Sequence, residues 1–117
     1  MTDTELLSHF EKKVSERGIH SLTYDDQLLF AVLKNTTLTH CPLCSSELKH
    51  SIFSECAGHG EFPRYLKIRC NGCSIEHVDC ISYDKTWKDA ENAFRVRCAK
   101  IAHAVAESLR KEKENDP

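Results

Sequence analysis

The sequence predicts a small α+β protein built around a zinc ribbon, in which an N-terminal helical hairpin and a long C-terminal helix flank a three-stranded antiparallel sheet. Three observations favour this fold: two Cys-x-x-Cys motifs in the middle, alternation of apolar and polar residues between and after them, and helical periodicity at both ends. At 117 residues, the chain is expected to form one compact domain. Its expected parts are the hairpin (1–40), the ribbon (41–85), the helix (86–112) and a disordered tail (113–117).

The N-terminal part predicts two short helices. Residues 4–17 carry apolar residues at helical spacing, Asp3 or Thr4 can cap the start, and Gly18 follows as a stop. A capping sequence at Thr23 predicts a second helix that ends near Lys34. The pair could form a DNA-reading helix-turn-helix, but Lys34 is the only basic residue of the second helix, whereas a recognition helix offers Arg, Asn or Gln to base edges. Packing against the rest of the protein is therefore the expected role.

Two cysteine motifs predict a zinc site with the ligands Cys41, Cys44, Cys70 and Cys73. The motifs read Cys-Pro-Leu-Cys and Cys-Asn-Gly-Cys, and 25 residues separate them. Two intervening residues let a tight turn aim both sulfurs at one point, where backbone N–H groups reduce the thiolate charge. The Asn-Gly pair of the second motif suits the left-handed backbone that its turn is expected to need. Disulfides and a redox motif are the alternatives, but a redox Cys-x-x-Cys normally stands singly at the start of a helix.

Three stretches with a period of two predict the sheet, at residues 47–54, 64–70 and 75–81. In the second stretch, one face carries Tyr65, Lys67 and Arg69, and the other carries Leu66, Ile68 and Cys70. The zinc site would lie at one end of the first hairpin, and residues 57–63 would form the tip at the other end.

A second set of metal-ligating residue types raises the alternative of two zinc ions per chain. Its members are Cys56, His59, His77 and Cys80. The order of the four pairs is that of a cross-braced two-zinc domain, although ten residues separate the second and third pairs, which nearly touch in a RING finger. His77 and Cys80 are three residues apart and would point to opposite faces of a regular strand, so a bulge would be needed. Otherwise Cys56 is free in a polar loop, Cys80 is in the core and both histidines are solvated.

The C-terminal helix carries an apolar stripe over about six turns. Its members are Trp87, Ala90, Phe94, Cys98, Ile101, Val105 and Leu109. The stripe is expected to cover the ribbon, the helical hairpin or another subunit, so that a homodimer through this helix is one alternative. Cys98 lies on the stripe and is expected to be a buried, unreactive thiol.

The charge distribution argues against a generic polyanion-binding protein, because the net charge is −2. It is uneven, however: residues 1–40 carry a balance of −2 and residues 64–100 carry +3. The N-terminus lacks the basic and apolar plan of a signal peptide, and no apolar run approaches the ~20 residues that span a bilayer. A cytoplasmic protein without membrane association is expected, in which the seven cysteines serve metal binding and burial rather than disulfides.

The stretch from Cys41 to Arg97 resembles the Lar-like restriction-alleviation family of phage and prophage zinc-ribbon proteins. The matching pieces are the Cys-Pro-x-Cys opening at Cys41, the closing motif within 66–73, and the helix segment 89–97 with its alanines, aromatic residue and arginines. Ser45 stands where the family usually has glycine, and residues 1–40 have no counterpart in the family. The resemblance implies a phage protein that acts in the host cytoplasm against a bacterial defence system.

The sequence supports two alternative functions. The first is a non-enzymatic interaction protein that binds and modulates a host defence protein. The alternative is a nucleic-acid-binding ribbon for transcription or replication, whose contacts would come from Arg64, Tyr65, Lys67 and Arg69. An enzyme is not expected, because a catalytic zinc keeps an open coordination position and four thiolates close it.

Overall fold

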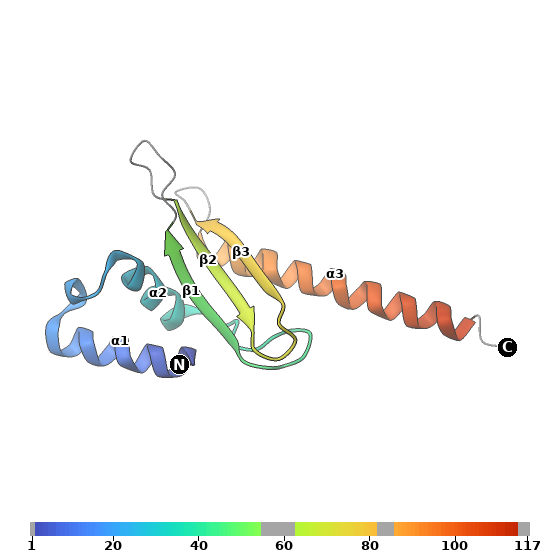
Figure 1. Ribbon diagram of the computed structural model, residues 1–117, viewed down its shortest axis with the longest axis horizontal. Coiled ribbons are helices and arrows are strands. Elements are labelled where there is room, and N and C mark those ends of the chain that lie inside the picture. The colour runs from blue at the N-terminus through green and yellow to red at the C-terminus, as the bar shows by residue number, and fades with distance from the viewer. Residues whose placement is uncertain (1, 55–62, 82–85, 115–117) are drawn as a thin grey trace.

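The computed structural model describes residues 2–54, 63–81 and 86–114 (Figure 1). The elements follow in the order α1 (Asp3–Arg17), the 3₁₀ turn η1 (Ile19–Ser21), α2 (Tyr24–Asn35), β1 (Leu48–Ser54), β2 (Arg64–Cys70), β3 (Glu76–Ile81) and α3 (Trp87–Glu114). Three helices and one three-stranded antiparallel sheet confirm the predicted α+β class. Most of the predicted hairpin tip, residues 57–62, lies outside the described residues.

The two N-terminal helices form a hairpin with its own small core. Thr2 caps α1 in a reciprocal capping box with Glu5, so the cap lies one residue before the predicted Asp3. Thr23 accepts a hydrogen bond from the Asp26 N–H and caps α2, as predicted. Five buried residues hold this hairpin together: Phe10, Leu22, Leu29, Phe30 and Leu33.

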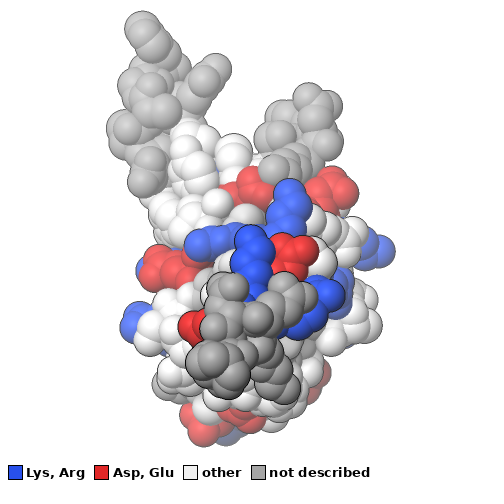
Figure 2. All heavy atoms as spheres, turned by 90° about the vertical axis from the view of Figure 1, so that its right-hand side faces the viewer, with Lys and Arg blue, Asp and Glu red and all other residues white. Residues whose placement is uncertain are grey.

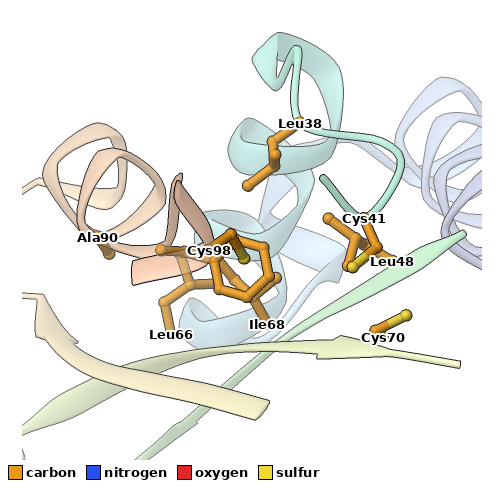
Figure 3. Packing of buried hydrophobic residues seen from close by; sticks show 9 residues of the cluster. Leu38, Cys41, Leu48, Leu66, Ile68, Cys70, Ala90 and Cys98 are labelled. Carbon is orange, nitrogen blue, oxygen red and sulfur yellow. The ribbon is translucent and has the colours of Figure 1, made fainter. Parts of the chain in front are cut away.

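The sheet has the strand order β1-β2-β3, and both pairings are antiparallel. Its register fixes two distinct faces, since side chains alternate along each strand. One face carries the buried residues Leu48, His50, Leu66, Ile68 and Cys70. The helices lie on this face: Figure 3 shows Ala90 and Cys98 of α3 against Leu66 and Ile68, with Leu38 above them.

Helix α3 divides into a packed half and a projecting half. Ala90, Phe94 and Cys98 are fully buried against the sheet, and the burial of Cys98 raises the pKa of its thiol. Every residue from 99 to 112 is exposed, and this part of the helix extends away from the sheet (Figure 1). The radius of gyration is 17.9 Å, compared with about 13 Å for a compact domain of this length. The helix also continues two residues beyond the predicted end at 112.

Among the described residues, no helix combines the length and apolar character that crossing a membrane requires.

Candidate metal centre

The four predicted cysteine ligands meet at one end of the sheet. The sulfur atoms of Cys41, Cys44, Cys70 and Cys73 all lie within 4.8 Å of one another. The Sγ–Sγ distances are 3.8 Å between Cys41 and Cys73 and 3.2 Å between Cys44 and Cys70. A tetrahedron with metal–sulfur bonds of about 2.3 Å has edges of about 3.8 Å, so this cluster fits one tetrahedral metal ion.

Backbone geometry in the two turns explains the convergence of the sulfurs. Sγ of Cys70 accepts hydrogen bonds from the N–H groups of Gly72 and Cys73, and Sγ of Cys41 accepts one from Leu43. These bonds delocalise thiolate charge, as the motif predicts. A left-handed residue directly follows each motif, Ser45 with φ 64° and Ser74 with φ 63°. The prediction that Asn71 or Gly72 supplies that conformation is therefore wrong.

Gly72 is required for space rather than for a left-handed backbone. A Cβ atom at this position would lie 2.7 Å from Cβ of Ser46 and 3.0 Å from Sγ of Cys44. Real Cβ atoms do not approach other heavy atoms so closely, so the first turn would have to move away from the second. The two turns that carry the four sulfurs touch at this point.

We expect Gly72→Ala to destabilise the metal-bound protein by about 1–3 kcal/mol, the usual cost of overpacking a close contact, and to weaken metal binding. Competition with a chromogenic chelator and thermal unfolding would measure both effects. Asn71→Ala, in the same turn at an exposed position, is the matched control. Equal metal affinity in the two variants would contradict this role of Gly72.

The close approach of the four thiols perturbs the pKa values of the cysteines. Hydrogen bonds from the side chain and backbone of Ser46 lower the pKa of Cys44 to about 6. A backbone hydrogen bond from Ile75 lowers the pKa of Cys73, but burial and the neighbouring thiols outweigh it and raise this pKa to about 11. Burial also raises the pKa of Cys41. Four thiolates so close together repel one another, and a divalent cation removes that repulsion.

The predicted second metal site is only half described, since Cys56 and His59 lie outside the described residues. The His77 ring lies on the helix-covered face, with its centroid 5.9 Å from that of Phe94 and its Nε2 3.5 Å from Asp79. Cys80 pairs with Tyr65 across the sheet, and its parity places it on the opposite face. This second site stays a prediction.

The four residues proposed for partner binding separate into two groups. Tyr65, Lys67 and Arg69 share the face of β2 that is directed away from the helices. Arg64 lies on the helix side, where its Nε donates to Asp25 at 2.8 Å and its guanidinium lies 4.1 Å from the centroid of the Tyr24 ring.

A buried charged network near the metal centre was missed by sequence reasoning. His50 is fully buried; its Nδ1 lies 2.9 Å from Asp3 Oδ2, and its Nε2 lies 3.6 Å from Glu91 Oε1. The Thr36 hydroxyl donates to Glu91 at 2.7 Å. Burial alone would lower the pKa of His50, but the two carboxylates outweigh it and raise this pKa to about 9. The network joins α1, β1, α3 and the end of α2.

The fold and the cysteine cluster together define a small α+β protein of the zinc-ribbon type, with one candidate metal centre among the described residues. A scan against models of protein families matched none of them, and searches of curated proteins and of solved structures found no match either.

Proposed function

We propose that this protein is a non-enzymatic, zinc-stabilised interaction protein that binds another protein through the projecting half of α3. Zinc is the ion that best suits four cysteine sulfurs in a tetrahedral arrangement. Four protein ligands leave no open coordination position, which supports a structural rather than a catalytic role.

The observation that carries the proposal is an apolar stripe with nothing packed on it in the part of the chain that the structure describes. Ile101, Val105 and Leu109 are 37%, 54% and 58% exposed. They lie on one side of the helix at spacings of four residues, and alanines at 99, 102, 104 and 106 accompany them. Small residues allow a partner to approach the helix backbone closely. Stripes of this kind dock into hydrophobic grooves of other proteins.

The area of this segment favours a groove over a second copy of the chain. The 14 residues from 99 to 112 span about 21 Å and have a lateral surface of about 700 Å². A single antiparallel helix would cover about a third of that surface, well below the ~800 Å² per partner of a standard interface. A groove that surrounds the helix covers about twice as much, about 470 Å², which is closer to that size.

Charge also disfavours pairing with a second copy. In the projecting half, residues 99–112, three basic residues accompany two acidic ones. In the antiparallel register that pairs Ile101 with Leu109, Lys100 would lie opposite Arg110 of the second copy, and like charges repel. Figure 2, which looks along the projecting α3 from its C-terminal end, shows Lys and Arg side chains gathered around the helix. The fitting partner therefore has an apolar groove with an acidic rim.

The resemblance of residues 41–97 to restriction-alleviation proteins supports a target in a bacterial defence system, encountered in the host cytoplasm. Expression of the protein in a bacterium with an active restriction system should then raise the plating efficiency of unmodified phage. Plating efficiency equal to that of cells without the protein would exclude a restriction target.

We expect the triple variant I101Q/V105Q/L109Q to fold normally, since these side chains contact no core, and to lose partner binding by at least about 100-fold. A photo-crosslinking residue at position 109 identifies the partner in bacterial cells, and titration with that purified protein measures affinity. The variant H103Q/E107Q, on the opposite side of the same helix, is the matched control and should bind normally.

Three results would overturn this proposal. They are equal binding by the triple variant and the wild type, binding to anionic lipid vesicles in place of a protein, and a stable homodimer that the triple variant abolishes.

A further inference from the structure

We infer that the open face of the sheet, the face directed away from the helices, binds single-stranded nucleic acid. This inference goes beyond the proposed function, because it concerns a different surface and a different class of partner. The face consists of nine side chains: Lys49, Ser51 and Phe53 of β1, Tyr65, Lys67 and Arg69 of β2, and Glu76, Val78 and Cys80 of β3.

The strand register arranges these side chains in three rows across the sheet. Lys49, Arg69 and Glu76 are directly opposite one another in the first row, nearest to the metal centre. The second row holds Ser51, Lys67 and Val78, and the third holds Phe53, Tyr65 and Cys80. Successive rows are about 6.7 Å apart, two residues along a strand. Basic groups therefore occupy one end of the face and aromatic rings the other.

The aromatic end offers a stacking surface. The Phe53 and Tyr65 rings are nearly parallel, at 21°, with their centroids 5.3 Å apart. Each ring is half-buried, so part of its surface is exposed to solvent. Nucleobases stack on such rings regardless of sequence, because every base has a π-face.

The basic end offers phosphate contacts. Lys49 and Arg69 are exposed, and Nζ of Lys67 forms an ion pair with Glu76 at 2.9 Å. Arg97 of α3 reaches the edge of β3 and donates to the carbonyl oxygen of Glu76 at 2.6 Å. Three lysines and arginines against one glutamate give this face a positive balance, although the whole chain carries −2. Cations beside stacked rings match the backbone and bases of one extended strand.

A single strand fits better than a duplex. The described residues place no helix on this face that could enter a major groove, and the bases of a duplex are not accessible to stacking on Phe53 or Tyr65. Recognition by a flat sheet through aromatic rings requires unpaired bases.

Fluorescence anisotropy with labelled 12-nucleotide oligo(dT), oligo(U) and a 12-base-pair duplex tests the inference on the metal-loaded protein. We expect micromolar binding of the single strands and weaker binding of the duplex. Three phosphate contacts on a single strand predict affinity that falls about 20-fold between 50 and 200 mM salt.

Variants on the two faces of β2 provide the matched comparison. Tyr65→Leu should weaken single-strand binding about 5- to 100-fold, as the loss of one stacked base does, and K67Q/R69Q should weaken it and flatten the salt dependence. Arg64→Gln removes one positive charge from the same strand on the helix side, next to Asp25, and should change the affinity less than twofold. Metal content and circular dichroism of each variant identify any that misfold, and ultraviolet crosslinking of oligo(U) to the wild type should label the peptide that contains Tyr65.

The inference is overturned if neither single strand binds at micromolar concentrations, if the duplex binds as tightly, or if Arg64→Gln weakens binding as much as K67Q/R69Q. The α3 triple variant should bind oligonucleotides as the wild type does, because its substitutions lie outside the open face. If the wild type binds no oligonucleotide, the protein-binding role of α3 is unaffected.

Discussion

Loss of zinc is expected to unfold most of the protein. The double variant C70S/C73S should bind no metal and show no cooperative thermal transition at 25 °C or above. Structural zinc contributes about 10–16 kcal/mol in small cysteine sites, whereas the net stability of a domain is only about 5–15 kcal/mol. Cys41 and Cys70 belong to the same buried cluster as Phe94 and Cys98, so disruption of the centre would extend into the core that holds α3.

Elemental analysis should find one zinc per chain in the wild type, or two if the predicted second site also binds metal. Circular dichroism and the fluorescence of the single tryptophan, Trp87, would follow unfolding with and without a strong chelator. Cys80→Ser removes a thiol that lies outside the four-cysteine cluster, so this control should keep the zinc of that centre and unfold cooperatively like the wild type. A metal-free wild type with an unchanged melting curve would contradict the zinc-dependent fold and, with it, the proposed function.

After loss of zinc, removal of the His50 side chain is expected to cause the largest loss of folding stability. His50→Gln leaves Asp3 and Glu91 without their shared positive charge, and removal of one partner from a buried ionic group typically costs 3–5 kcal/mol. The pH dependence identifies the cause. The pKa of His50 is raised from 6.5 to about 9 by folding, so its charge contributes about 3 kcal/mol below pH 6.5.

That contribution decreases as the pH rises from 6.5 to 9, where only the unfolded chain has released the proton, and it is gone once the folded protein also releases it above pH 9. The stability difference between the wild type and His50→Gln should therefore be largest below pH 6.5 and should decrease strongly by pH 10. Chemical denaturation of the metal-loaded proteins at several pH values measures this difference. His103→Gln is the matched control, since His103 also pairs with a glutamate, Glu107, but is 69% exposed. A stability difference that is independent of pH would show that His50 is neutral in the folded protein.

Short-range patterns in the sequence are sufficient to predict the elements and the convergence of the four cysteines. The spacing of the four cysteines specifies two turns, and a period of two specifies the faces of β2, including the grouping of Tyr65, Lys67 and Arg69. The start of α2 is readable in the same way, because Thr23 supplies the local cap that the helix needs.

What the sequence does not provide is the outcome of contacts between distant segments. In β1, His50 alternates with the apolar residues Leu48 and Ile52 and so lies on the same face of the strand. In α3, Glu91 directly follows Ala90 of the apolar stripe. Those positions are the only signal that two charged residues enter the core, and nothing local shows that Asp3 joins them. Similarly, the apolar stripe of α3 is continuous from Trp87 to Leu109. Periodicity therefore cannot indicate that the helix stops packing on the sheet after Cys98.

The contact between α3 and the sheet ends at Cys98, so one uninterrupted helix is under two kinds of evolutionary constraint. Under the proposed function, substitutions on the stripe up to Cys98 affect folding, and those beyond it affect partner binding. The distal turns could then diversify without loss of the fold, and a lineage could acquire a new target by changing a few residues there.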